Sequence, residues 1–142
     1  MCFHYQSEIF KVLYEGSLRT RAVHIASGST IVTDAPTDNN GKGEAFSPTD
    51  LVATSLASCM LTIMGIIAER DGIDLKGAHA EVEKVMSKNP RRISKVGIRI
   101  HLNGHLINPP DRDRLERAAR RCPVGGSLHP EIEEEVIFVY DE

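Results

Sequence analysis

The sequence predicts an α+β protein whose elements follow the order βββ-α-ββ-α-β. Short alternating segments fill the first third of the chain, one long apolar segment of helical character follows, and alternating segments return in the second half around another helical segment. The length of 142 residues fits a single domain covering residues 1–142. A chain of this size can bury a core that needs neither a disulfide nor a metal to fold.

Composition excludes several classes of protein. The chain is 41% hydrophobic and 26% charged, which excludes a wholly disordered chain. Its 17 basic and 20 acidic residues give a net charge of −3, so we expect no nucleic-acid partner. Three cysteines, an odd count, indicate a reducing compartment rather than a secreted disulfide scaffold. The first residues lack the pattern of a signal peptide, and we expect a cytoplasmic protein.

The first third predicts three strands, at residues 9–14, 21–26 and 30–33. Turn residues at 16–17 and 27–29 separate them, which favours an antiparallel meander. Residues 34–47 then predict a long loop rich in proline, asparagine and glycine. Loops of this length are often functional, although a mobile surface connection explains the composition equally well.

The central helix has clear boundary signals. Ser47 is a good N-cap, Pro48 suits the first helical position, Asp50 stands three residues after the cap, and Gly72 suits the C-terminal end. The 18 uncharged residues from 51 to 68 reach the lower limit of a membrane span, but their flanks are not aromatic, so we favour a buried central helix and expect no membrane partner. Because apolar residues occur on nearly every face, we expect a partner subunit to complete the core.

The second half predicts a hairpin, a helix and a last strand. Residues 78–86 and 93–102 alternate apolar and polar positions and flank a turn at 88–90. A helix is expected at 111–121, with an acidic first turn and a basic last turn, and a strand at 132–140.

Two cysteines are candidates for chemistry. Cys59 lies in the middle of the apolar helix, where a cysteine acts most simply as a small buried hydrophobe and is inert unless a cation is near. Cys122 precedes Pro123, and if a short helix begins there, Cys122 is its N-cap. The positive helix end and two neighbouring arginines would then lower the pKa of its thiol, although a merely packed capping cysteine is the alternative. Cys2 receives no role.

Other chemistries have little support in the sequence. The chain has no CxxC or HExxH spacing, no phosphate-binding glycine loop and no nucleophile elbow. His101 and His105 are four residues apart but flank a strand end, where solvated side chains are the simpler interpretation. We therefore expect no cofactor, and a Cys/His metal site is the weakest of the hypotheses.

Two motifs together resemble a known family. SPTDLVATSLASCM at residues 47–60 and RCPVGGSLHP at 121–130 look like the OsmC/Ohr family of thiol-dependent hydroperoxide reductases, in the same order and over about residues 14–140. Residues 33–51 resemble the subgroup called OsmC-like. The resemblance implies antiparallel sheets wrapped around a central helix, in an intertwined homodimer whose active sites lie at the subunit interface.

The resemblance also implies roles. Cys59 matches the peroxidatic cysteine, whose thiolate attacks the peroxide, and Cys122 matches the resolving cysteine, which converts the sulfenic acid to a disulfide. An apolar pocket would favour organic hydroperoxides over hydrogen peroxide. The family uses an arginine to stabilise the thiolate, for which Arg19 and Arg21 are the candidates here and Lys42 a weaker one.

One departure from the family stands out. Its hydroperoxidases carry a glutamate ten residues before the helix cysteine, where this chain has Thr49, followed by Asp50. Asp50 would either substitute in part for the glutamate or simply cap the helix. The leading hypothesis is a peroxidase in oxidative-stress defence, reduced by an external dithiol of lipoyl-protein or thioredoxin type. The alternative, which Thr49 favours, is a non-enzymatic binding or electrophile-sensing module with an apolar pocket at the dimer interface.

Overall fold

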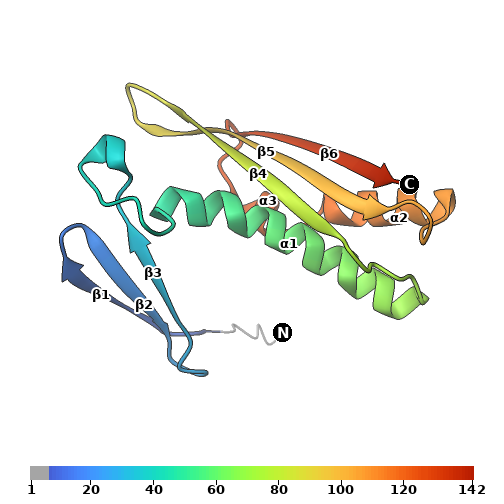
Figure 1. Ribbon diagram of the computed structural model, residues 1–142, viewed down its shortest axis with the longest axis horizontal. Coiled ribbons are helices and arrows are strands. Elements are labelled where there is room, and N and C mark those ends of the chain that lie inside the picture. The colour runs from blue at the N-terminus through green and yellow to red at the C-terminus, as the bar shows by residue number, and fades with distance from the viewer. Residues whose placement is uncertain (1–6) are drawn as a thin grey trace, which may run out of the picture. The chain divides into compact units, whose positions relative to one another are not determined.

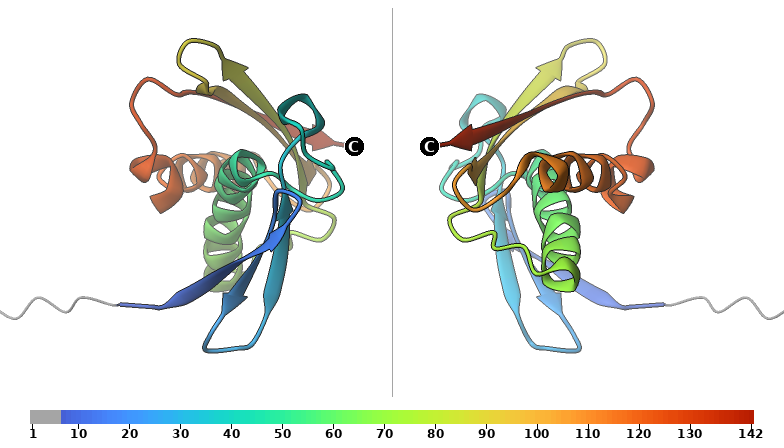
Figure 2. Two further views of the ribbon diagram at one scale, coloured as in Figure 1. Left: turned by 90° about the vertical axis from the view of Figure 1, so that its left-hand side faces the viewer. Right: turned by 90° about the vertical axis from the view of Figure 1, so that its right-hand side faces the viewer.

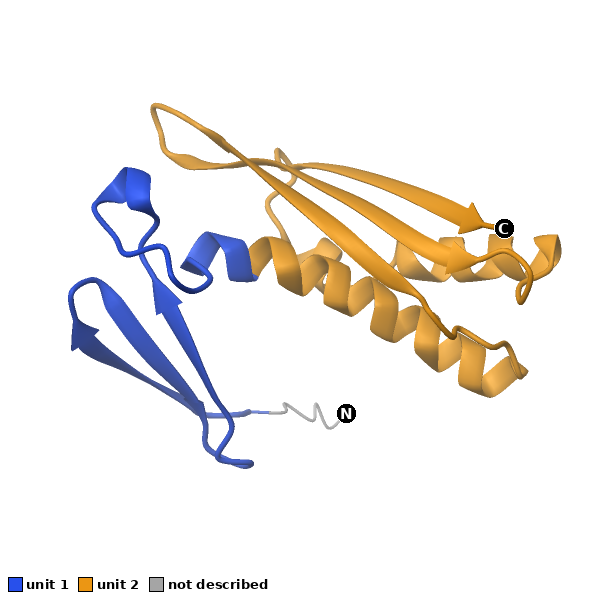
Figure 3. Ribbon diagram, viewed as in Figure 1, with its two compact units in different colours: residues 1–51 blue, residues 52–142 orange. Residues whose placement is uncertain are grey.

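The computed structural model describes residues 7–142, which divide into two compact units, one up to Leu51 and one from Val52 to Glu142 (Figure 3). The order of elements along the chain matches the predicted order βββ-α-ββ-α-β, with one short additional helix. We describe each unit by itself. That residues 1–142 behave as one domain stays a prediction.

The first unit contains the predicted antiparallel meander. Its strands are β1 (Phe10–Gly16), β2 (Arg19–His24) and β3 (Thr30–Asp34), in the order β1-β2-β3 (Figure 1). The strand β2 begins two residues earlier than predicted, because a tight turn at Ser17 and Leu18, both with positive φ, reverses the chain at once. The loop that follows contains one turn of 3-10 helix, η1 (Thr37–Asn39).

The central helix, α1 (Pro48–Asp71), has the predicted boundaries. Ser47 and Asp50 form a reciprocal capping box: the Asp50 N–H donates to Ser47 Oγ at 3.1 Å, and the Ser47 N–H donates to Asp50 Oδ2 at 2.9 Å. At the other end, Gly72 has a φ of +71°, a conformation that favours glycine and ends the helix.

The helix α1 is buried along one face. It is long and apolar enough to cross a membrane, and a third of its most apolar 18-residue window is buried within the chain. The buried residues recur at helical spacing and belong to the core of the second unit: Ala53, Leu56, Ala57, Met60, Met64 and Ala68. On the other side of the helix, Ser58, Thr62 and Ile66 are exposed, so the chain alone does not enclose it; that a partner subunit completes the core stays a prediction.

The sheet of the second unit contains β4 (His79–Ser87), β5 (Arg92–Asn103) and β6 (Glu133–Asp141). The hairpin of β4 and β5 is antiparallel as predicted, but β6 pairs with β5 in parallel, so the prediction of antiparallel sheets is wrong for this pair. The reason is the connection: two helices lie between β5 and β6 and return the chain to the end of the sheet at which β5 begins.

Those two helices are α2 (Pro109–Ala119) and α3 (Pro123–Ser127). The helix α2 begins two residues earlier than predicted, because the Asn108 side chain caps it by accepting from the Asp111 N–H at 3.0 Å. The predicted short helix after Cys122 is confirmed as α3, with Cys122 as its N-cap.

The core of the second unit lies between one face of its sheet and the helices. The helices α1 and α2 lie on the same side of the sheet (Figure 1 and Figure 2). Alternate residues of β5 supply the buried layer of the sheet, namely Val96, Ile98, Ile100 and Leu102. Cys122 is part of this core, with 2% of its surface exposed, so the chain directly after α2 is held against α1.

Candidate thiol site

Two cysteines from distant parts of the sequence converge in the second unit. Cys59 lies on α1, partly buried, and Cys122 is buried at the start of α3. Both are free thiols, and they lie close enough together that Cys59 raises the pKa of the Cys122 thiol. The structure therefore brings together the two cysteines that the sequence singled out. Cys2 lies outside the described residues.

Local structure explains how the two thiols meet. Cys59 is three residues after Leu56, which is fully buried, so Cys59 lies at the edge of the helix face that packs into the core. Cys122 is fixed by its capping role, because its Sγ accepts a hydrogen bond from the Gly125 N–H at 3.4 Å. The short connection between α2 and α3, together with the capping role of the thiol, thus places Cys122 near Cys59.

Gly125 leaves space beside the thiols. A Cβ at this position would lie 3.5 Å from Cys122 Sγ, 3.5 Å from a methyl group of Leu56 and 3.1 Å from Glu134 Oε1. A side chain at this position would therefore crowd the carboxylate beside the thiol. Sequence reasoning did not single out Glu134, because it is the middle one of three consecutive exposed glutamates, Glu133–Glu135.

The electrostatics of Cys122 differ from the prediction. Burial raises the pKa of the Cys122 thiol, and neighbouring Cys59 and Glu134 raise it further, while the Gly125 N–H acts in the opposite direction. The prediction that a helix end and two arginines lower this pKa is wrong in direction. The helix α3 has only five residues, and one N–H donor does not offset the burial of the sulfur.

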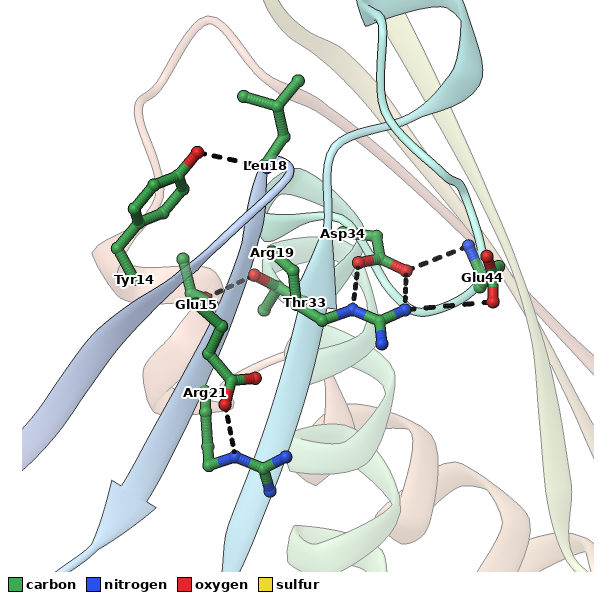
Figure 4. Close-up of polar contacts among 9 residues, drawn as sticks. Tyr14, Glu15, Leu18, Arg19, Arg21, Thr33, Asp34 and Glu44 are labelled. Carbon is green, nitrogen blue, oxygen red and sulfur yellow. Dashed lines mark hydrogen bonds and ion pairs between the residues drawn. The ribbon is translucent and has the colours of Figure 1, made fainter.

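The two candidate arginines lie in the first unit and have different surroundings (Figure 4). Arg19 forms a two-point ion pair with Asp34, with Nε–Oδ1 and Nη2–Oδ2 distances of 2.7 Å each. Asp34 is 1% exposed and also accepts from the Glu44 N–H at 3.1 Å. The hydrogen bonds from Arg19 hold the pKa of the Asp34 carboxyl below its ordinary value, and the same pair raises the pKa of Arg19.

Arg21 is held less firmly. Its Nε lies 3.1 Å from Glu15 Oε2, and both side chains are at least one third exposed. Such a pair has little orienting strength in water. The structure thus distinguishes Arg19 as the cation with a fixed orientation. Asp34, which sequence reasoning placed only at the start of a loop, was missed; it is opposite Arg19 in the register of β2 and β3.

Thr49 and Asp50 belong to the beginning of α1. The Asp50 carboxylate caps the helix through the Ser47 N–H, and the hydroxyls of Thr49 and Ser47 are 3.3 Å apart. Of the two interpretations of Asp50, the capping role is the one that these contacts support. Lys42 acts only at a distance in the same unit, where its charge lowers the pKa of Asp34 slightly.

The histidines take part in ordinary surface contacts. His101 Nε2 is 2.6 Å from Glu81 Oε1, Nδ1 is 3.3 Å from Asp141 Oδ2, and the ring stacks on His79 with centroids 4.7 Å apart. Within residues 7–142, no three histidine, cysteine, aspartate or glutamate side chains gather as a metal site requires. The chemistry that the structure supports best is that of the paired thiols, which can be oxidised to a disulfide.

The chain is similar to several solved structures. A solved structure from Psychrobacter arcticus 273-4, described as an osmotic stress induced and detoxification response protein, is 51% identical, covers 97% of this chain and 99% of its own, and has a TM-score of 0.88. An organic hydroperoxide resistance protein OsmC from Legionella pneumophila is 18% identical over 96% of this chain and 99% of its own, with a TM-score of 0.75.

A third solved structure, an organic hydroperoxide resistance protein from Vibrio cholerae with captopril bound in one of its active sites, is 18% identical over 97% of this chain and 94% of its own, with a TM-score of 0.68. No curated protein matches the chain. The model of the OsmC-like protein family matches residues 41–136 of this chain. This range includes Cys59, Cys122 and the capping box of α1. The chain therefore belongs to the OsmC-like protein family.

Proposed function

We propose that this protein reduces organic hydroperoxides with the Cys59–Cys122 pair, as part of oxidative-stress defence. The observation that carries the proposal is the proximity of the two cysteines, which pack in one hydrophobic core, one partly exposed and one buried. An exposed thiol can meet a peroxide, while a buried neighbour can only react with what forms on the first. The hydroperoxide resistance proteins with the same fold make a peroxide the leading substrate class.

The proposed reaction has three steps. The Cys59 thiolate attacks the peroxide, the O–O bond breaks, and an alcohol leaves after taking up a proton, so that Cys59 becomes a sulfenic acid. The Cys122 sulfur then attacks the Cys59 sulfur, which forms the disulfide and releases water. An external dithiol, of lipoyl-protein or thioredoxin type, finally reduces the disulfide by thiol exchange.

A cation is needed to form the thiolate at Cys59 in an apolar setting. Of the two candidates, we propose Arg19 over Arg21, because Asp34 holds its guanidinium in one orientation. We expect Arg19→Ala to slow peroxide consumption by a factor of 10 or more, a loss typical of one charged group. Arg21→Ala is the matched control and is expected to retain the wild-type rate.

We propose that the protein acts as a homodimer in the cytoplasm, without membrane or nucleic-acid partners. An open groove between α1 and β4 is lined by small and apolar residues, namely Thr54, Ala57, Ser58, Leu61, Thr62, Ala80 and Val82. In the first unit, Phe10, Val12 and Tyr14 of β1 are all more than half exposed. A second copy of the chain is the occupant that would remove such surface from water.

The test compares two peroxides on the reduced protein. Stoichiometric tert-butyl hydroperoxide is expected to be consumed faster than hydrogen peroxide, with one equivalent lost per chain. Cys59→Ser should abolish the reaction, whereas Cys122→Ser should consume one equivalent and stop at a sulfenic acid that dimedone traps. Equal, slow reaction in wild type and Cys59→Ser would overturn the proposal.

A second candidate function is a binding or electrophile-sensing module. The open groove beside α1 and the threonine at position 49 favour it. Cys59→Ser separates the two: a binding module retains its affinity for an apolar ligand, whereas the peroxidase loses all turnover.

A further inference from the structure

Glu134 departs from the apolar pattern of the last strand. Within β6, all of which the structure describes, the core-facing positions 134, 136, 138 and 140 are occupied by Glu134, Val136, Phe138 and Tyr140. Glu134 is opposite Val96 in the parallel register, and Val96 is completely buried. Residues opposite each other in a ladder point to the same face of a sheet. Glu134 therefore lies on the same side of the sheet as the helices, near the beginning of β6, where its side chain is still exposed to solvent.

This carboxylate lies beside the resolving thiol. Glu134 Oε1 and Cys122 Sγ are 3.1 Å and 3.5 Å from one point, the position that a Gly125 Cβ would occupy. The carboxylate and the thiol therefore lie beside the same face of Gly125, with no side chain of residue 125 between them. One water molecule between a carboxylate and a thiol can connect the proton donor to the acceptor.

We propose that Glu134 is the proton-transfer residue of the resolving step, receiving the Cys122 proton as the disulfide forms and passing it to the departing oxygen of the Cys59 sulfenic acid. This inference rests on the proposed peroxidase function and assigns a role within it.

The step balances as written. The S–O bond of the Cys59 sulfenic acid and the S–H bond of Cys122 break, and the Cys59–Cys122 S–S bond and one O–H bond form, with water released. The Cys122 sulfur supplies the electron pair of the new S–S bond, and the oxygen leaves with the electron pair of the S–O bond, so no further oxidant is needed. Glu134 ends the step in the protonation state in which it began.

The neighbouring charges fit this role. Arg120 and Arg121 precede Cys122 at the end of α2, and Cys59 of α1 and Glu134 of β6 lie near it. Lys84 is opposite Val96 on the core-facing row of β4. Arg120 lies over the Phe138 ring, with its guanidinium carbon 5.2 Å from the centroid. The groups that act on the charge of Cys122 are Cys59 and Glu134, and both favour its protonated form. Cys122 therefore keeps its proton until an acceptor takes it during the attack.

The direct test measures the two chemical steps separately in Glu134→Gln. Rapid mixing with tert-butyl hydroperoxide, followed by dimedone trapping, gives the rate of sulfenic acid formation, and acid quenching with mass spectrometry gives the rate of disulfide formation. We expect disulfide formation at pH 7 to slow by about 100-fold, the range for loss of a general base, with sulfenic acid formation unchanged. The pH profile of disulfide formation should lose its acidic limb.

Glu133→Gln is the matched control, because its side chain is on the opposite face of β6. Disulfide formation at the wild-type rate in Glu134→Gln would overturn the inference. Failure of the wild-type protein to form a sulfenic acid would instead overturn the proposed function, and the proton-transfer role with it.

A second measurement does not depend on peroxide chemistry. In the Cys2→Ser, Cys59→Ser protein, thiolate absorbance titrates Cys122 alone. Glu134→Gln should move the midpoint to lower pH, because a nearby negative charge has been removed, while Glu133→Gln should not. An unchanged midpoint would show that Glu134 does not act on Cys122.

Discussion

Leu56→Ala tests how tightly the thiol site depends on core packing. Leu56 is 0% exposed, and one of its methyl groups borders the space at Gly125. Replacing a buried leucine by alanine costs about 2–5 kcal/mol, and more where neighbours cannot fill the cavity. Gly125 has no side chain and Cys122 is held as a helix cap, so neither can move in. We therefore expect a loss of about 4 kcal/mol in the free energy of unfolding.

The assay is denaturant unfolding followed by circular dichroism, at one fixed protein concentration because subunit association would change the midpoint. At about 3 °C per kcal/mol, the melting temperature should fall by about 10 °C. Leu106→Ala removes the same atoms from a side chain that is 40% exposed and should cost about 1 kcal/mol. A loss below about 1.5 kcal/mol in Leu56→Ala would refute the reasoning, since it would mean that the site collapses around the cavity.

Three further predictions concern the cap and the two groups with shifted pKa values. Ser47→Ala removes the capping hydroxyl of α1 and should cost about 1 kcal/mol by denaturant unfolding. The lowered pKa of Asp34 means that its pairing with Arg19 stabilises the protein above about pH 4 and is lost as the pH falls further, so Asp34→Asn should flatten the acid side of the stability profile. The raised pKa of the Cys122 thiol has the opposite consequence. Its contribution to the free energy of unfolding is present below about pH 8.5 and is lost as the pH rises through the pKa of the folded state. Cys122→Ser should therefore flatten the alkaline side of the stability profile.

The boundaries of α1 could be predicted because its end signals are local. Ser47, Pro48 and Asp50 act through their own backbone neighbours, and no distant residue is needed to interpret them. The cysteine pair was predicted through motif resemblance, and the structure places both cysteines in the same hydrophobic core.

The features that sequence reasoning missed depend on distant parts of the chain. The parallel pairing of β5 and β6 follows from the path of two helices, which alternation cannot reveal. The pKa of Cys122 was predicted in the wrong direction because burial by α1 and the sheet outweighs a five-residue helix. Asp34 and Glu134 acquire their importance from partners opposite them in a ladder, Arg19 and Val96.

The most direct test of the proposed chemistry is the identity of the bond that forms after one turnover. Reduced protein is treated with one equivalent of tert-butyl hydroperoxide, alkylated, digested without reductant and analysed by mass spectrometry. The paired thiols predict one dominant linkage, Cys59–Cys122, formed faster than any modification of Cys2. Slow oxidation spread over all three cysteines would contradict the proposal and favour the binding module.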